Sequence, residues 1–408
     1  MKPLRGGAEG DIVRLDLFYE FCQGAGYPIP HGADRQLFEE ILEQAEVADE
    51  AGFDVFWSVE HHGSVEVTHM PAPEQFLTAV AMRTKQLRVG HSVVLTHPNF
   101  NHPVRVAERA SVLDNLSGGR LEMGFGRSTP REWAIFHIDG DETRPVLEEV
   151  LHLMPQIWTQ DSFQYDGEYF QIAPITMVPR MLQKPHPRMW IAAGSDESLK
   201  MAGRLGIGVL SLTLLRPFSE LEKTLSIYRE AQQVQDPVAP DLVNNQAGAF
   251  TFVYCAPTLD EAINDGASEA AAWYMSKVYA LYGSIPVREG EAGYHFARDR
   301  AAQIEAIEKS GDSPGRQVML KLLDEVPVSR LEFYEAMNAE NQIVVGTPDE
   351  VIRKLEAYEG IGLDRMMCMV MGGPDLPQEK ILQSLKLMGE TVIPHFHDRS
   401  PDPKPPIE

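Results

Sequence analysis

Four polar groups in this sequence are of types that could carry chemistry. A histidine ring can give or take a proton near neutral pH, and an arginine can bind a phosphate through paired hydrogen bonds. A glycine–serine run at the start of a helix offers backbone N–H groups to an anion. The groups are Glu60-His61-His62, Thr96-His97, Arg127 and Gly194-Ser195.

Each of these groups directly follows a run of residues typical of a β-strand. Between the strands lie helical stretches; in one, Leu37, Ile41 and Ala45 recur at helical spacing, with Asp34 expected as its N-cap and Gly52 as the residue that ends it. The predicted strands cover 12–21, 53–59, 87–95, 121–126, 189–193, 207–214, 247–255 and 364–371.

This alternation predicts an α/β fold, namely a (β/α)₈ TIM barrel. A doubly wound open sheet shares the alternation, but no GxGxxG motif follows the first strand. In a TIM barrel the active site lies at the C-terminal ends of the strands. We therefore expect the four polar groups to meet at one end of the barrel.

The domain prediction is a single barrel over 1–397. The charged segment at about 283–341, interrupted by glycine and proline, forms an insertion between the seventh and eighth strands. An active-site lid and a surface excursion without function are equally consistent with it. The Pro-rich end, 398–408, is expected to be a disordered tail.

Composition excludes several classes of partner. A formal net charge of −24 repels nucleic acid and anionic membranes, and no run long and apolar enough to span a membrane is present. The three cysteines form no CxxC pair, which favours a reducing compartment, so a cytoplasmic location is expected. The adjacent histidines diverge and lack a third ligand at metal spacing, so no metal site is predicted.

Two of the polar groups have a structural interpretation beside the chemical one. His61 and His62 are as consistent with a structural role as with a general base. Ser195 alone is typical of a helix N-cap, but Arg127 at a neighbouring strand end favours a phosphate site.

Several ordered stretches resemble the bacterial luciferase-like monooxygenase family across nearly the whole barrel. The most specific is HPVRVAERASVLDNLSGGRLEMGFG, with its Leu-Asp-x-Leu-Ser-x-Gly-Arg turn, and FDVFWSVEHH resembles the second strand with its Glu-His-His ending. The resembling stretches are 53–62, 102–126, 189–205 and 345–355.

The resemblance implies that reduced FMN binds at the barrel mouth and reacts with dioxygen to give a flavin hydroperoxide. His61 matches the catalytic histidine of the family. The positions that match its cofactor-binding residues are Arg127, Ser195 and Ser198 for the flavin phosphate, Gly194 beside them, and Ser92 and Val93, which with His91 match a third-strand segment that often contains a non-proline cis peptide.

The expected activity is an FMN-dependent monooxygenation. An apolar pocket lined by Phe21, Trp57 and Leu212 would suit an aldehyde, ketone or terpenoid. Gly194 and Leu212 replace a glutamate and a tryptophan of true luciferases, which favours a general monooxygenase over a light-emitting enzyme. The chain shows no nicotinamide motif, so an NAD(P)H-dependent flavin reductase is the expected partner.

The resemblance also implies a homodimer formed through helices next to the early strands. Three alternatives remain beside the monooxygenase. A deazaflavin-dependent oxidoreductase of the same superfamily is the nearest, followed by a non-catalytic flavin-binding protein and, more distantly, a metal-dependent barrel hydrolase.

Overall fold

Eight parallel β-strands form a closed barrel, because β8 pairs with both β7 and β9 and so joins the two ends of the sheet. The computed structural model describes residues 13–22, 29–65, 67–212, 218–282, 284–288, 294–298, 300–308, 313–371 and 376–397. The barrel strands, in their order around the barrel, are β1 (Arg14–Tyr19), β2 (Val55–Ser58), β3 (Arg88–Leu95), β4 (Leu121–Gly126), β7 (Met189–Ala192), β8 (Gly208–Leu212), β9 (Ala247–Cys255) and β13 (Arg365–Met369). The predicted TIM barrel is confirmed.

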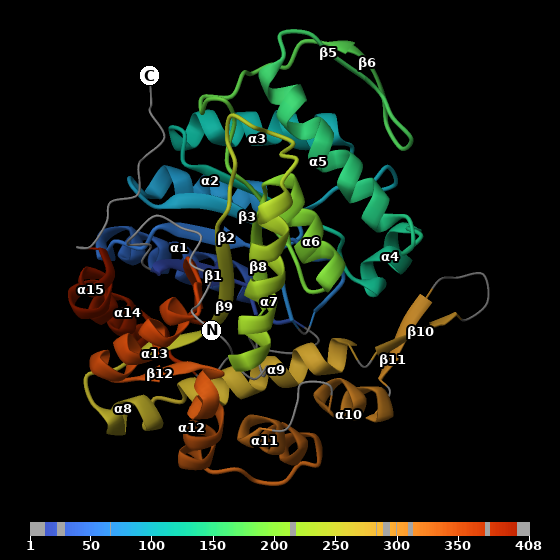
Figure 1. Cartoon of the computed structure of the whole chain (residues 1–408). Coiled ribbons are helices and arrows are strands. Elements are labelled where there is room, and N and C mark those ends of the chain that lie inside the picture. The colour runs from blue at the N-terminus through green and yellow to red at the C-terminus, as the bar shows by residue number, and fades with distance from the viewer. Residues whose placement is uncertain are drawn as a thin grey trace.

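Helices surround the barrel and connect its strands (Figure 1). Gly52 and Gly118 follow α1 and α3 with φ of 92° and 68°, left-handed values that glycine adopts without a steric penalty. The helices outside the late insertion are α1 (Ala33–Ala51), α2 (Pro73–Arg83), α3 (Pro103–Ser117), α4 (Pro130–Phe136), α5 (Thr143–Thr159), α6 (Asp196–Leu205), α7 (Phe218–Ala231), the short η1 (Gln232–Val234), α13 (Pro348–Gly360), α14 (Gln378–Leu387), η3 (Met388–Val392) and α15 (Ile393–His397).

Two local features differ from the sequence predictions. Asp34 is not the N-cap of α1, because Gly32 precedes the first turn and the Asp34 carboxylate instead lies 2.6 Å from Nδ1 of His69. Helix α4, between β4 and α5, was not predicted. A hairpin follows α5, made of β5 (Phe163–Asp166) and β6 (Gln171–Ile175), which pair antiparallel.

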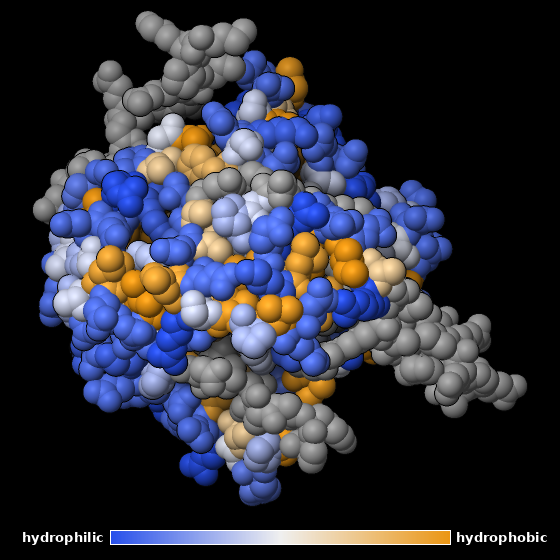
Figure 2. Space-filling model, turned by 90° about the horizontal axis from the view of Figure 1, so that it is seen from below, coloured by the Kyte–Doolittle hydropathy of each residue, from blue (hydrophilic) through white to orange (hydrophobic). Residues whose placement is uncertain are grey.

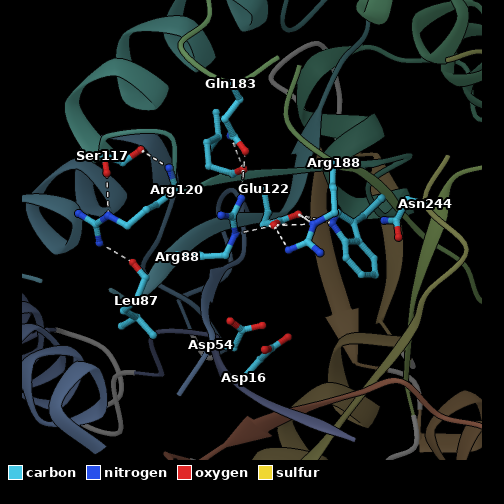
Figure 3. Close-up of polar contacts among 12 residues, drawn as sticks. Asp16, Asp54, Leu87, Arg88, Ser117, Arg120, Glu122, Gln183, Arg188 and Asn244 are labelled. Atoms are coloured by element: carbon cyan, nitrogen blue, oxygen red, sulfur yellow. Dashed lines mark hydrogen bonds and ion pairs between the residues drawn. The ribbon is translucent and has the colours of Figure 1, made fainter. Parts of the chain in front are cut away.

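Buried ion pairs fill the N-terminal end of the barrel (Figure 3). Glu122 of β4 accepts hydrogen bonds from Arg88 Nε and Arg188 Nη2, both at 2.7 Å. Arg365 of β13 makes a two-pronged contact with Asp16 of β1 at 2.9 Å and also pairs with Asp54. Burial alone would raise the pKa of Glu122, but the two arginines lower it to about 2.

Two tryptophan rings close the lumen just beyond these ion pairs. Trp57 of β2 and Trp190 of β7 pack edge to face, with ring centroids 5.6 Å apart, and both are fully buried. A Cβ on Gly90 would lie 2.3 Å from the Trp57 ring, and one on Gly208 would lie 2.5 Å from the Trp190 ring. Only glycine therefore fits beside each ring. The two rings together form the floor of the lumen.

A long insertion separates β9 from β13. Its hairpin strand β11 contacts α4, which lies next to it in Figure 1. Figure 2 shows apolar side chains gathered in a band across the face seen from below, the side on which Figure 1 places α9, α11 and α12. The elements of the insertion are α8 (Leu259–Asn264), α9 (Ala267–Tyr282), β10 (Ser284–Arg288), β11 (Tyr294–Arg298), α10 (Arg300–Glu308), α11 (Pro314–Leu323), α12 (Arg330–Asn338), η2 (Ala339–Asn341) and β12 (Val344–Gly346), which extends the sheet beside β9.

The predicted tail at 398–408 lies outside the described residues. Within the part of the chain that the structure describes, no helix is both long enough and apolar enough to cross a membrane.

Candidate active site

The side chains of β1 show which residues face the lumen. Asp16 contacts Arg365 and Trp57 across the interior of the barrel, and Phe18 stacks on Phe250 of β9 with ring centroids 4.3 Å apart. Alternate residues of a strand share a face, so Glu20 continues this row beyond the end of β1. The C-terminal mouth of the barrel therefore lies at the level of Glu20.

His61 is held at this mouth by a carboxylate that the sequence analysis missed. Its Nδ1 lies 3.1 Å from Oε1 of Glu132, on α4, and 28% of the His61 side chain is exposed. Glu132 also accepts hydrogen bonds from the backbone N–H of His62 at 2.8 Å and from the hydroxyl of Ser128. The pairing occupies Nδ1 and leaves the Nε2 edge of the ring for a ligand.

Charge pairing determines the protonation of both partners. Burial lowers the pKa of His61, but the hydrogen bond and the negative charge of Glu132, with smaller contributions from Glu20 and Glu60, raise it to about 9. Burial raises the pKa of Glu132, whereas its contacts with His61 and Ser128 lower it to about 2. At neutral pH the pair is a cationic imidazolium beside a carboxylate.

The other members of the Glu-His-His run have structural contacts. His62 packs edge to face against Phe100 and Phe136, with ring centroids 5.0 Å away in each case. Glu60 is buried, and its Oε2 accepts a hydrogen bond of 2.9 Å from the backbone N–H of Leu95. His62 Nε2 also lies 3.5 Å from Oε1 of Glu60, but 16% of its side chain is exposed against 28% for His61.

The third strand is irregular where the resemblance placed a cofactor-binding segment. The peptide between Ser92 and Val93 is cis, and the register with β4 shifts between His91 and Val94. Val93 lies over the glycines of β4, because a Cβ on Gly126 would be 2.1 Å from its side chain. The neighbouring His91 is buried, and burial lowers its pKa to about 4.

Ser195 and Ser198, two of the residues predicted to hold a phosphate, lie beside an arginine that the sequence analysis did not name. Arg144, at the start of α5, donates to the hydroxyls of Ser198 at 3.1 Å and Ser195 at 3.4 Å. Burial and the positive charge of Arg144 both lower the pKa of Arg127, so the two guanidiniums share one region of charge. Ser195 also caps α6, since its hydroxyl accepts from the N–H of Ser198.

The partners of both guanidiniums are uncharged, which makes the site suitable for an anion. Arg127 donates to the hydroxyl of Thr143 at 2.9 Å and Arg144 donates to serine hydroxyls, so neither guanidinium is neutralised by these hydrogen bonds. The charge of Arg144 also acts on the exposed carboxylate of Glu197, at the start of α6. A Cβ on Gly194 would meet no atom within 4 Å, so there is space in front of α6. The donors suit a phosphate group.

A hollow beside Arg127 extends this site over the barrel mouth. Two polar atoms in its wall, Thr96 Oγ1 and His97 Nε2, are buried without a hydrogen-bond partner among the described residues. Such atoms are rare in folded proteins and suit a ligand that brings its own hydrogen-bonding groups. The hollow is lined by Leu95, Thr96, His97, Phe100, Gly126, Arg127, Ser128, Phe136, Ile138 and Thr143.

The three residues predicted to line an apolar pocket do not come together at the mouth. Phe21 lies two residues beyond the end of β1, with φ of 55°, and is fully buried outside the lumen, where it packs against Phe38 of α1 and Phe76 of α2. Trp57 lies too deep, in the floor, where its Nε1 donates to Asp16 at 2.8 Å. Leu212 ends β8, and its side chain lies outside the described part of the chain.

No group of three or more His, Cys, Asp or Glu residues is arranged to hold a metal ion within the described ranges. The polar side chains that the structure places at or near the mouth are Arg127, Arg144, Ser195, Ser198 and His61.

The chain is similar to known oxidoreductases over most of its length. The chain is 27% identical over 374 residues to the oxygenase component of flavin-dependent trigonelline monooxygenase from Acinetobacter baylyi, covering 90% of this chain and 92% of that protein. It is 24% identical to the F420-dependent glucose-6-phosphate dehydrogenase of Amycolatopsis mediterranei, covering 87% of this chain and 93% of that one.

A solved structure of similar architecture is a monooxygenase from Streptomyces bottropensis. It is 27% identical, with a TM-score of 0.67 over 94% of this chain and 100% of that chain. The family model described as luciferase-like monooxygenase matches residues 17–365, from within β1 to the first residue of β13. Since this match takes in six whole barrel strands, part of β1 and the residues at the strand ends, the chain belongs to the luciferase-like monooxygenase family.

Proposed function

We propose that this protein is the oxygenase component of a two-component monooxygenase that uses reduced FMN and dioxygen to oxygenate a small apolar substrate. The observation that carries the proposal is the pairing of Arg144 with the hydroxyls of Ser195 and Ser198, close to Arg127 and beside a mouth that holds His61. Such a site suits a flavin phosphate, and the family contains both flavin-dependent and F420-dependent relatives.

In this proposal each residue has a stated task. Arg127 and Arg144 hold the phosphate through charge-assisted hydrogen bonds, and Ser92 and Val93 form the wall beside the ring system. Reduced FMN, when bound, supplies the electrons that activate dioxygen. His61 is kept protonated by Glu132, so its Nε2–H donates a hydrogen bond or a proton to the reacting oxygen.

The lumen above the tryptophan floor supports an apolar substrate, although its walls differ from those predicted. Phe18 and Phe250 stack there, and Phe252 packs against Tyr274 of α9. An aldehyde, ketone or terpenoid fits walls of this kind. The insertion, whose strand β11 contacts α4, would cover the mouth as a lid and exclude water during turnover.

Several partners belong to the same proposal. The A. baylyi relative is an oxygenase component by name, which supports an NAD(P)H-dependent flavin reductase as the source of reduced FMN. The three cysteines are buried free thiols, consistent with a reducing cytoplasm. Exposed apolar residues on α2 and α3, namely Met82, Val112 and Leu116, support a homodimer that packs through these helices.

The experiment that tests the function is an anaerobic titration with reduced FMN and, separately, reduced F420, followed by rapid mixing with oxygenated buffer. Tight binding of FMN and slow reoxidation, accelerated by an apolar ketone or aldehyde, are the expected results. Preference for F420 would assign a deazaflavin-dependent oxidoreductase, which the A. mediterranei relative favours. FMN that binds yet reoxidises as in free solution would indicate a flavin-binding protein without catalysis.

A further inference from the structure

Glu20 is a lumen-facing carboxyl group at the barrel mouth that the proposed mechanism does not use. It follows Asp16 and Phe18 on the inner face of β1, where Asp16 pairs with Arg365 of the neighbouring strand β13 and Phe18 stacks on Phe250 of β9. Tyr19, on the opposite face, donates instead to Gln44 of α1 at 2.8 Å. The alternation of the strand therefore directs Glu20 into the chamber where the substrate would lie.

The two oxygens of this carboxyl group are in different situations. Oε1 accepts a hydrogen bond of 2.9 Å from the hydroxyl of Tyr274, on α9 of the insertion. Oε2 is buried and makes no hydrogen bond with any described residue. Tyr274 is itself fixed edge to face against Phe252, with ring centroids 5.4 Å apart. One oxygen is thus held in place, and the other is left for a ligand.

The surroundings favour the protonated carboxylic acid. Burial raises the pKa of Glu20, the charge of His61 and the hydrogen bond from Tyr274 lower it, and the charge of Glu132 raises it. The thiol of Cys22 is also buried nearby, and burial and the charge of Glu20 both raise its pKa. Because Glu132 already balances the imidazolium, a negative charge on Glu20 would have no partner of its own.

We propose that Glu20 is a substrate-binding residue, positioned by Tyr274 through Oε1, that donates a hydrogen bond from Oε2 to the carbonyl oxygen of an otherwise apolar substrate. This assignment rests on the proposed function and narrows its substrate class to ketones and aldehydes. Phe18, Phe250 and Phe252 contact the hydrocarbon part. The carbonyl then lies in the same chamber as His61, which is close enough to Glu20 for the two side chains to interact electrostatically.

The binding test uses protein loaded with oxidised FMN and a matched pair of probes, 2-octanone and octane, followed by calorimetry and by the flavin absorbance. We expect the ketone to bind at least about tenfold more tightly than octane, as one buried hydrogen bond allows. Glu20→Leu should remove that preference and leave octane binding unchanged. Glu20→Gln, which keeps an acceptor for Tyr274 and an N–H donor, should retain most of it. Equal binding of both probes to the unaltered protein, or an unchanged preference in Glu20→Leu, would overturn the proposal.

A second measurement needs neither substrate nor flavin. Infrared difference spectra between the unaltered protein and Glu20→Gln at pH 7 should show the C=O stretch of a protonated carboxyl group, shifted in Tyr274→Phe. Absence of that band contradicts the proposal even where both variants fold normally. Failure to bind FMN would instead count against the proposed function and would leave the infrared result unaffected, so the two failures are distinguishable.

Discussion

Nδ1 of His61 lies 3.1 Å from Oε1 of Glu132, although the two residues are 71 positions apart in the chain. The same carboxylate binds the backbone N–H of His62, so α4 fixes both the side chain and the loop that follows β2. The connection joins the second and fourth strand ends into one rigid unit. It also makes the charge of the histidine depend on a short helix.

Glu132→Gln should convert His61 into an ordinary or weakly basic histidine. Its pKa is expected to fall from about 9 to below 6.5, because burial then acts without the opposing carboxylate. Histidine NMR titration measures this directly, and the alkaline limb of the pH–rate profile should move in the same direction. Glu356→Gln is the matched control, since it removes a carboxylate 3.0 Å from the distant surface histidine His395. A His61 pKa that stays near 9 would show that Glu132 is not its main partner.

The same pair should leave a signature in stability against pH. His61, with a pKa raised from 6.5 to about 9, stabilises the fold fully below pH 6.5 and loses that contribution as pH rises through 9. Glu132, with a pKa lowered from 4.5 to about 2, contributes above pH 4.5 and loses its contribution as pH falls through 2. The difference in unfolding free energy between the unaltered protein and Glu132→Gln should therefore be largest between about pH 4.5 and 6.5. A difference that is constant from pH 4 to 10 would contradict this assignment.

Arg144→Met should weaken FMN binding by roughly ten- to a hundredfold, the range expected for losing a charge-assisted contact with phosphate. Riboflavin, which lacks the phosphate, should bind both proteins equally, and this separates phosphate recognition from general damage. Fluorescence titration at two salt concentrations provides the measurement. Arg105→Met on α3, where the side chain is 67% exposed, is the control. Equal losses for FMN and riboflavin would place Arg144 outside the phosphate site.

Arg365→Met should destabilise the barrel by about 3–5 kcal/mol, the usual cost of leaving buried charges without a partner. The substitution leaves Asp16 and Asp54 without the guanidinium that pairs with them in the unaltered protein. Urea unfolding followed by circular dichroism measures the loss, with Arg105→Met again as reference. A destabilisation below 1 kcal/mol would mean that water or a shifted side chain replaces the guanidinium.

Leu116→Lys should turn a dimer into a monomer. Leu116 and Val112 lie four residues apart on one exposed face of α3, where a second copy would cover them. A buried lysine on each side of a symmetric contact adds two unpaired charges. Sedimentation velocity gives the mass; a dimer that persists would exclude this face.

Hydrophobic patterning was sufficient to predict the barrel because each strand is a short apolar run bounded by helices with clear periodicity. The inner and outer faces of those strands could not be told apart, since parallel barrel strands are buried on both sides. That ambiguity is why Phe21 was wrongly placed in the pocket and why Glu20 was overlooked. Trp57 does lie on the inner face. How deep its ring lies in the lumen depends on its packing against Gly90 of β3, a residue of another strand.

The residues of the site that were missed have local explanations. Glu132 belongs to a seven-residue helix, too short for periodicity, yet Thr129 and Glu132 form a capping box with proline at the first turn. That motif was readable and would have revealed the helix. Arg144 lies at the beginning of α5, and nothing in the sequence indicates that it reaches Ser198.

Among the described residues, Trp57 and Trp190 block the lumen at the end opposite the mouth, together with the buried ion pairs. In the proposed function, cofactor, dioxygen, substrate and product would therefore all cross the mouth. A molecule seated near the entrance therefore delays the exchange of one bound deeper. Whichever of flavin and substrate binds deeper must then enter first, so the two ligands bind in a compulsory order.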